Sequence, residues 1–410
     1  MTGQHHPTNQ TSPDARRAER GPFVFIFSLL LIEFLDELLF GVREAAWPLI
    51  RDDLRLSYTQ VGLLLSVPGI VGNLIEPGLG ILADVWRRRV IVLCGGAVFA
   101  AATLLVGLSH SFTVLLAALV LLNPASGAFV SVAQASLMDA APRRHEQNMA
   151  RWTFSGSLGN VIGPLAVGAA LAVGLGWRTL FVGLSIMAAL VLANTWRFSF
   201  PTPARDESAE ESPGFKTGLK QALRALRRRE VLRWLVLLEV GDFTNDILRG
   251  FLALYFVDVV GVTQARAALA VIVWTTVGLP GDFLLIPLLE RVRGLSYLRW
   301  STASTLVLFP ALLLVDGWTT KLVLLGMLGL ANAGWYSILK ARLYSEMPGQ
   351  SGTVMTLGGI FGLAHDLTPL LMGAFAERYG LGAMMWLLVA GPALLLVGLL
   401  TAPKPDSQDG

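Results

Sequence analysis

The chain has 410 residues, of which 54% are hydrophobic and only 15% are charged. Soluble domains carry about a quarter charged residues, so a water-soluble core cannot account for this composition. The 42 glycines and 20 prolines are scattered, which excludes a collagen repeat, and the single cysteine, Cys94, excludes an internal disulfide. The sequence therefore predicts a polytopic, all-α membrane protein.

Apolar stretches of about 20 residues, the length that spans a bilayer, alternate with short charged runs. Residues 1–21 are polar and are expected to form a disordered cytoplasmic tail. Beyond this tail, the apolar windows predict twelve transmembrane helices. They cover residues 22–50, 58–83, 90–108, 112–138, 149–173, 178–200, 231–260, 265–289, 297–315, 321–345, 352–376 and 382–400.

A polar segment, residues 201–230, divides these helices into six and six, and we interpret it as a cytoplasmic linker. The two expected units are residues 22–200 and 231–402, followed by a short cytoplasmic tail at 403–410. Most of the 32 Lys and Arg residues fall in the tail, the linker and the loops on one side. The positive-inside rule then predicts a multi-pass protein of the cytoplasmic membrane with both termini in the cytoplasm.

The two halves share an internal repeat of polar positions. A single constant shift along the chain places Glu33 on Glu239 and Asp36 on Asp242. A parallel duplication of a six-helix unit is typical of transporters that bind substrate between the halves. The same shift also pairs Arg43 with Arg249, Glu76 with Asp282, Asp84 with Glu290, Gln134 with Lys340 and Asn160 with Asp366.

Residues 80–89 read Gly-Ile-Leu-Ala-Asp-Val-Trp-Arg-Arg-Arg. This segment resembles the helix 2–3 loop motif of the major facilitator superfamily, G-x-L-A-D-R-x-G-R-R, with Val85 and Arg87 replacing the usual residues. The resemblance implies the MFS fold, with two pseudo-symmetric six-helix bundles. It also implies a conformational latch that joins the halves in the outward-facing state. The latch residues would be Gly80, Asp84, Arg87, Arg88 and Arg89, with a weaker second copy at Glu290 and Arg291.

The fifth predicted helix carries a glycine pattern that resembles the family's antiporter motif: Gly159, Gly163, Pro164 and Gly168. Residues 53–62 also resemble the bacterial drug exporters of this family, which favours export. Small residues promote close packing in any membrane bundle, so a purely structural role is the alternative. Asn123 stands where many of these exporters carry an arginine in the fourth helix, so proton coupling cannot rely on that arginine.

Ionisable residues within the spans cost roughly 2.5–3.5 kcal/mol each on insertion scales and normally face a cavity or a partner. Glu33, Asp36 and Glu37 share one face of the first helix. Likewise, Glu239, Asp242 and Asp246 share one face of the seventh. In this family the first and seventh helices line the central cavity. Crowded carboxylates in a low-dielectric site can retain a proton, which suits proton coupling. The predicted coupling and substrate residues are Glu33, Asp36, Glu37, Arg43, Glu239, Asp242, Asp246, Arg249, Lys340, His365 and Asp366.

Several alternatives remain open at this point. Glu76 and Asp282 are expected to act as gates or proton sites near the cytoplasmic helix ends. Arg249 can instead form a structural salt bridge with Asp246, as Arg43 can with Asp36. Acids outnumber bases in the spans, which favours a cationic or zwitterionic substrate, but the bases could clamp an anionic group. Trp335 and Tyr336 are expected to pack or to anchor at the interface, with an apolar cavity wall as the alternative.

We therefore predict a secondary transporter that works by alternating access and exports an amphipathic, cationic small molecule in exchange for protons. It would need no cofactor or metal, would bind no nucleic acid and would act as a monomer in the bilayer. The alternatives are a coupled importer of a metabolite, metal ion or lipid, and a membrane receptor that transports nothing. An enzyme is excluded because no nucleophile–base pair or phosphate loop is present in the sequence.

Overall fold

The computed structural model describes residues 13–85, 88–140, 145–198, 224–347, 357 and 361–401, and every regular element in these ranges is a helix. The first half contains α1 (Pro13–Leu54), α2 (Tyr58–Val85), α3 (Arg88–Gly107), α4 (Phe112–Ser126), η1 (Gly127–Ser131), α5 (Val132–Ala140), α6 (His145–Ala172) and α7 (Trp177–Thr195). The second contains α9 (Arg229–Asp258), α10 (Gln264–Leu289), α11 (Gly294–Leu314), α12 (Trp318–Ala331), α13 (Trp335–Ser345), α15 (Thr368–Tyr379), α16 (Leu381–Leu387) and α17 (Ala390–Leu400).

Four of the predicted spans are interrupted within the described residues. The fourth is built from α4, η1 and α5, with Pro124 just before the π-helical turn. The tenth breaks between α12 and α13 at Gly334, whose φ of +73° lies in the left-handed region that favours glycine. In the eleventh, two turn residues at 366–367 separate helical residues 361–365 from α15. The twelfth consists of α16 and α17. With these breaks included, the prediction of an all-helical membrane protein with twelve helices is confirmed.

The first helix starts earlier than predicted. It begins at Pro13, so residues 13–21 are helical, and residues 1–12 lie outside the described part of the chain. Proline is favoured at the first position of a helix, and the Ala, Arg and Glu residues that follow it are strong helix formers. The polarity of this segment had suggested disorder, but its helix propensity is high. The linker residues 199–223 and the last residues, 402–410, also lie outside the description.

Two helices combine length with an unusual charge content. By length and composition, nine helices of the described residues can cross a membrane. Helices α1 and α9 have 42 and 30 residues and are also long enough, but their acidic residues lower their mean hydropathy. Acids are costly to place in a membrane, so those of α1 and α9 are the leading candidates for a functional site.

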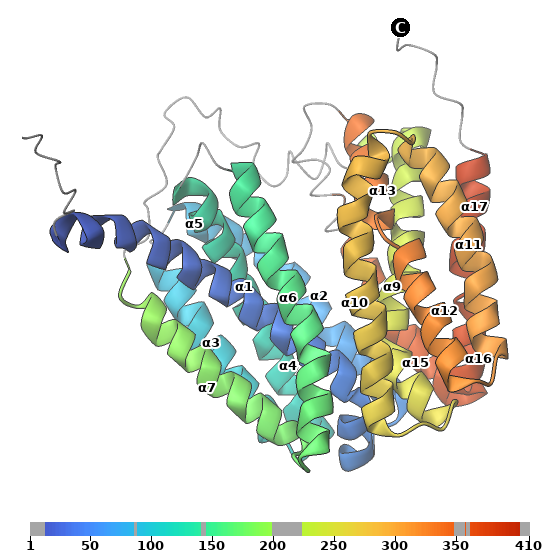
Figure 1. Ribbon diagram of the computed structural model, residues 1–410, viewed down its shortest axis with the longest axis horizontal. Coiled ribbons are helices and arrows are strands. Elements are labelled where there is room, and N and C mark those ends of the chain that lie inside the picture. The colour runs from blue at the N-terminus through green and yellow to red at the C-terminus, as the bar shows by residue number, and fades with distance from the viewer. Residues whose placement is uncertain are drawn as a thin grey trace, which may run out of the picture.

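The helices form two groups, α1–α7 and α9–α17 (Figure 1). The groups touch through α2 with α15, α6 with α10, and α1 with α9 and α10. Helices α6 and α10 lie close together at their lower ends and diverge upward in this view. The start of α1 and the end of α17 lie toward the same upper side, as an even number of crossings requires.

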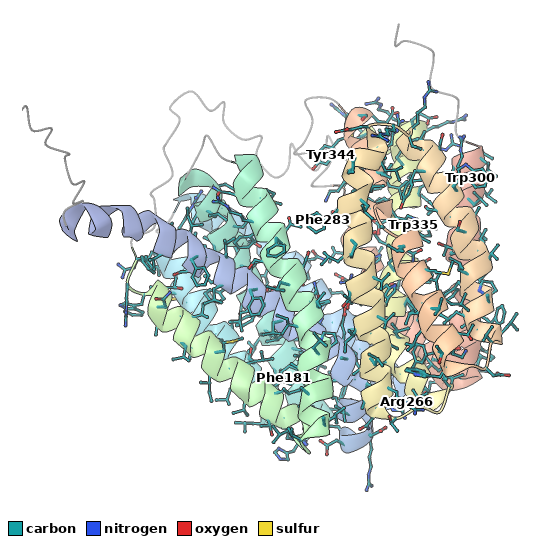
Figure 2. The ribbon with its side chains drawn as sticks, viewed as in Figure 1. Phe181, Arg266, Phe283, Trp300, Trp335 and Tyr344 are labelled. Carbon is teal, nitrogen blue, oxygen red and sulfur yellow. The ribbon has the colours of Figure 1, made fainter. Side chains whose placement is uncertain are left out.

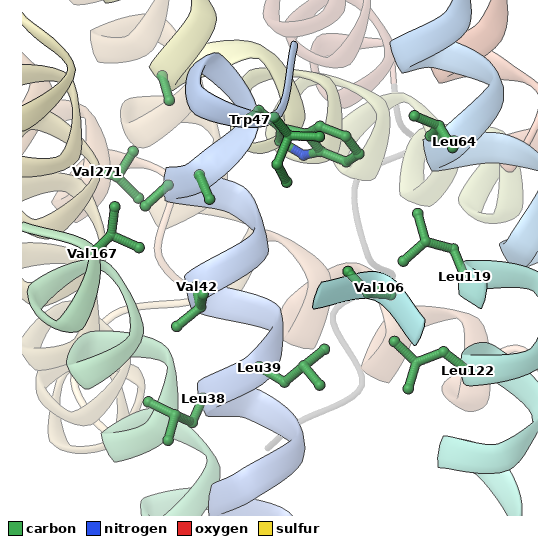
Figure 3. Close-up of a cluster of buried hydrophobic side chains, with 14 of the residues drawn as sticks. Leu38, Leu39, Val42, Trp47, Leu64, Val106, Leu119, Leu122, Val167 and Val271 are labelled. Carbon is green, nitrogen blue, oxygen red and sulfur yellow. The ribbon is translucent and has the colours of Figure 1, made fainter. Parts of the chain in front are cut away.

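Helix α1 passes through the middle of the larger hydrophobic cluster, which includes residues of both halves. Leu38 and Val42 face Val167 of α6 and Val271 of α10, whereas Leu39 faces the opposite way (Figure 3). Apolar side chains on the outer surface are exposed in contrast: Trp300 of α11 is 77% exposed and points outward, away from the bundle (Figure 2). Hydrocarbon is as apolar as these side chains, so an outward apolar surface fits a protein in a bilayer.

Candidate transport site

Three acids of α1, Glu33, Asp36 and Glu37, are each held by a neighbouring helix of the first half. Glu37 accepts a hydrogen bond from Asn160 Nδ2 of α6, with 2.6 Å between donor and acceptor. Glu33, one turn earlier, accepts one from Trp152 of the same helix. Asp36 contacts a different helix and accepts a hydrogen bond from Ser126 Oγ of α4 at 2.7 Å. The three acids thus share the inner side of α1 but are divided between α4 and α6.

Glycines of α6 allow this close approach. A Cβ atom on Gly159 would stand 2.4 Å from the Phe34 carbonyl oxygen, and one on Gly163 would stand 2.6 Å from the Val42 nitrogen. Gly156, which the sequence analysis did not single out, is similar: a Cβ atom on it would stand 2.6 Å from Glu33 Oε1. Gly168 faces open space instead. Two of the three glycines of this pattern therefore pack closely against α1, and this packing brings Asn160 to Glu37.

Two acids of α9 flank His365, which lies just before α15. His365 Nε2 lies 2.9 Å from Asp246 Oδ2, and its Nδ1 lies 3.5 Å from Glu239 Oε2. Asp242 interacts electrostatically with both acids, with His365 and with Lys340 of α13. Lys340 in turn donates a hydrogen bond to the hydroxyl of Tyr336. The structure thus brings together most of the residues predicted for this half.

One of the ion pairs between α1 and α9 joins Glu44 to Arg249. Arg249 Nε lies 3.6 Å from Oε1 of Glu44, whose side chain is only 4% exposed. Sequence reasoning considered Asp246 as the partner of Arg249, but Asp246 pairs with His365. Glu44 was missed, although an acid inside the first predicted span carried the same signal as Glu33. Arg43 lies over the ring of Phe40, 4.3 Å from its centroid, and interacts electrostatically with Asp36, Glu37 and Glu44.

A cavity of about 440 Å³ lies between the halves and is lined by α6, α9, α10, α12 and α13. Asn160 and Arg249 contribute to its wall, together with Trp274 and Tyr336. Among the described residues that line it, Arg249 is the only charged side chain. The cavity can therefore offer aromatic faces, amides and one cation to a small molecule. Its Asn160 and Arg249 are bound to Glu37 and Glu44.

Two amides of the second half that line this cavity are hydrogen-bonded to each other. Asn332 Nδ2 donates to Asn245 Oδ1 at 2.8 Å, and Thr305 Oγ1 donates to Asn332 Oδ1 at 2.8 Å. Trp335 is only 1% exposed and points inside the second half (Figure 2), with its indole nitrogen 2.8 Å from Ser301 Oγ. Sequence reasoning missed the asparagines because it searched for charge. An uncharged amide inside an apolar span is the signal that would have found them.

The two halves are bound together at the ends of α1 and α9. Arg51 and Tyr58 of the first half both bind the carboxylate of Asp258. Glu377 Oε2 accepts from the backbone nitrogen of Tyr58 at 2.7 Å, and Gln264 Nε2 donates to Asp52 at 3.1 Å. At this end, therefore, polar contacts seal the space between the halves.

The predicted latch and gate residues are described only in part. Arg87 lies outside the described residues, as do the side chains of Asp84 and Asp282 and the surroundings of Gly80. Arg89 Nη2 donates to the Trp196 carbonyl oxygen at 2.7 Å, which is a contact within the first half. Arg88 is nearly buried, and Glu290 and Arg291 are exposed at the end of α10. A latch between the halves stays a prediction for another conformation.

Glu76 of α2 lies beside the π-helical turn. A Cβ atom on Gly127 would stand 3.0 Å from Glu76 Oε1, and Glu76 also interacts electrostatically with Asp366. Within the described residues, no three His, Cys, Asp or Glu side chains are grouped as a metal site requires. The role of Glu76 as a gate or proton site stays a prediction.

Residues 29–364 match the Major Facilitator Superfamily. The chain belongs to this superfamily. It is a multi-pass membrane protein and a secondary transporter of a small molecule, not an enzyme. The MFS fold also accounts for the two groups of helices and for the cavity between them.

Comparison with known proteins shows distant relatives along nearly the whole chain. The fosmidomycin resistance protein of Escherichia coli K12 is 21% identical over 416 residues, which cover 100% of this chain and 99% of the relative. The quinolone resistance protein NorA of Staphylococcus aureus is 22% identical over 371 residues, covering 87% and 89%. These identities are low, so they leave the substrate of this MFS chain undetermined.

Solved structures show the same fold. A bacterial homolog of the human lysosomal transporter Spinster, in an inward-facing and unoccupied conformation, superposes with a TM-score of 0.76 at 18% identity, covering 92% of this chain and 96% of that one. The nucleoside transporter NupG gives a TM-score of 0.75 at 14% identity, covering 92% and 98%. At such identities the likeness establishes the fold alone.

Proposed function

We propose that this MFS chain is a proton-coupled antiporter that exports an amphipathic small molecule by alternating access. The observation that carries the proposal is the set of carboxylates on α1 and α9, of which Glu37 and Glu44 bind residues that line a cavity between the halves. The resistance functions named for two distant relatives support export. The Arg-rich side, with both termini, would face the cytoplasm, and the transporter would act as a monomer in the cytoplasmic membrane.

Asp36 is suited to gain and lose a proton in place. Its partner is the hydroxyl of Ser126, and a hydroxyl can donate to a carboxylate or accept from a carboxylic acid. The Asn160 side chain likewise offers Glu37 both a hydrogen-bond donor, its NH₂ group, and an acceptor, its carbonyl oxygen. A proton can therefore bind without leaving a buried polar group unsatisfied, which would otherwise be costly.

The substrate we propose carries a cationic group. The Asp246 side chain is 52% exposed, so it is accessible to a bound cation, and Asp242 lies in the same group of acids. The competing class is an anionic substrate, which is favoured by Arg249 in the wall of the cavity. The aromatic faces of Trp274 and Tyr336 suit a lipophilic part in either case.

The test uses purified protein in phospholipid vesicles with an imposed pH gradient. The probes are a lipophilic cationic dye and an anionic dye of similar size. We expect proton-driven movement of the cationic dye, which Asp36→Asn and Asp242→Asn should each abolish. Asp316→Asn, which removes an exposed carboxylate between α11 and α12, is the matched control and should transport normally.

Each alternative predicts a different result. Movement of the dye in the same direction as the protons would establish an importer, and transport of the anionic dye alone would place the substrate at Arg249. Unchanged transport in both Asp variants would overturn the assignment of the coupling residues. A receptor predicts no transport of any probe, whichever variant is used.

A further inference from the structure

The contact between α2 and residues 365–377 is unusually close, and we call it the α2–α15 seam. A Cβ atom on Gly62 would stand 2.5 Å from the Pro369 carbonyl oxygen, and one on Gly69 would stand 2.6 Å from Asp366 Oδ1. A carboxylate therefore lies directly against the backbone of a helix in the other half. The glycines make this possible because any larger side chain would push the two halves apart.

Within the part of the chain that the structure describes, three hydrogen bonds cross the seam along its length. The nitrogen of Tyr58 donates to Glu377 at the sealed end, which we call the outer end because it faces outward in the proposed orientation. The nitrogen of Leu370 donates to Ser66 Oγ at 2.9 Å, further from this end. The innermost bond runs from Asn73 Nδ2 to Asp366 Oδ2, at 2.6 Å. Since α2 and α15 must separate when the sealed end opens, all three bonds belong to the closed state of that end.

The innermost bond differs from the other two because Asp366 is chemically connected to the acids of α9. Its neighbour in the chain, His365, binds Asp246 and Glu239. A proton that enters this group changes the charge around Asp366 directly. The titratable and charged groups around the His365–Asp366 pair are Glu239, Asp242 and Asp246 of α9, Glu76 of α2, and Lys340 of α13 through Asp242.

We propose that Asn73 is a positioning residue that keeps the outer end of the empty transporter closed while Asp366 is ionised, and that this bond weakens when a proton or a cationic substrate occupies the neighbouring acids. A hydrogen bond to a carboxylate is roughly twice as strong as one between neutral groups, so protonation of Asp366 weakens the seam. The empty, deprotonated transporter then cannot reopen outward by itself. This lock prevents protons from crossing without an exchange of substrate, and it rests on the proposed proton-coupled antiport.

The test needs no substrate, because loss of the lock should produce a proton leak. Purified full-length protein is placed in vesicles that contain a pH-sensitive dye, and proton uptake is followed after a pH jump. Asn73→Ala should leak about tenfold faster than the unmodified protein, the factor expected for a lost hydrogen bond to a carboxylate. Asn73→Gln keeps the amide donor and should restore most of the lock.

Two controls separate the lock from simple damage. Ser66→Ala removes a bond of the same seam that does not involve Asp366, so it should leak much less than Asn73→Ala. Adding Asp242→Asn to Asn73→Ala should return the leak to the baseline, because the leak depends on a proton-binding acid. An equal leak in Ser66→Ala, or no leak in Asn73→Ala, would overturn the proposal.

A distance measurement separates this proposal from the proposed function. Spin labels at Met149→Cys and Leu289→Cys, in a Cys94→Ser background, lie on exposed positions of α6 and α10, away from the seam. Asn73→Ala should shift the distances toward the form that is open at the outer end, whether or not the protein couples transport to protons. Absence of this shift counts against Asn73 alone. Absence of proton-driven dye transport in the unmodified protein counts against antiport.

Discussion

The acid groups of the two halves match at two positions of the repeat, Glu33 with Glu239 and Asp36 with Asp242, but their members have different partners. On α1, Asp36 and Glu37 are held by uncharged donors from α4 and α6. On α9, Glu239 and Asp246 share the ring of His365, which can itself carry a charge. The repeat therefore sets where carboxylates stand, and local partners decide what they respond to. We interpret the α9 group as the more sensitive to protons.

The largest effect should follow from separating α1 from α6. Gly163→Ala would place a methyl group 2.6 Å from the Val42 nitrogen, and overpacking of this kind costs about 1–3 kcal/mol. The helices must move apart, so Glu37 loses Asn160 and the α1 group is disrupted. We expect transport to be lost and the apparent melting temperature to fall.

Gly168 supplies the matched control on the same helix. It faces open space, so Gly168→Ala adds a methyl group without a clash and should leave transport and melting temperature unchanged. Equal losses in both variants would mean that the glycines set the conformation of α6, not its distance from α1.

The second prediction compares the two groups directly. His365→Ala removes the ring that Glu239 and Asp246 share, leaving like charges close together, whereas Asn160→Ala removes one neutral donor from Glu37. We expect His365→Ala to move the pH profile of transport by about one unit or more, and Asn160→Ala to move it less. Similar shifts in both variants would show that the halves respond equally to protons.

The sequence predicted the number of crossings and the position of most of the acids, because both follow from charge and hydropathy along the chain. It could not predict partners, which depend on how each helix is rotated and what lies opposite. Asn160 and Asp366 illustrate this, since the repeat aligns them. Asn160 binds Glu37 within its own half, whereas Asp366 binds Asn73 across the seam.

The missed residues have a similar explanation. Asn332 carries no charge, so its role depends on its bonds to Asn245 and Thr305, which only the folded chain brings together. Gly156 matters because Glu33 lies against it, and that contact depends on the angle between α1 and α6. Glu44 is different, because its charge was visible in the sequence and only its partner Arg249 required the structure.

The third prediction concerns Ser126, whose hydroxyl holds Asp36. Ser126→Ala removes one hydrogen bond to a carboxylate and should slow transport by at most about tenfold. Ser126→Thr keeps the hydroxyl and should restore most of the rate. A full loss of transport in Ser126→Ala, with normal protein yield, would contradict this expectation. It would show that Asp36 depends on its neutral partner as strongly as we expect the α9 acids to depend on His365.

The smallest effect should come from the pair that joins the two groups. Glu44→Gln keeps the shape of the side chain but removes its charge, so Arg249 loses a cross-half partner. Arg249 is 38% exposed, and solvent screening limits the cost to about 1 kcal/mol. We therefore expect a modest shift of the distances between labels at Met149→Cys and Leu289→Cys, with transport retained. Asp53→Asn is the control, because Asp53 pairs with Arg178 inside the first half and should leave these distances unchanged. If Glu44→Gln also leaves them unchanged, the Glu44–Arg249 pair does not couple the two groups.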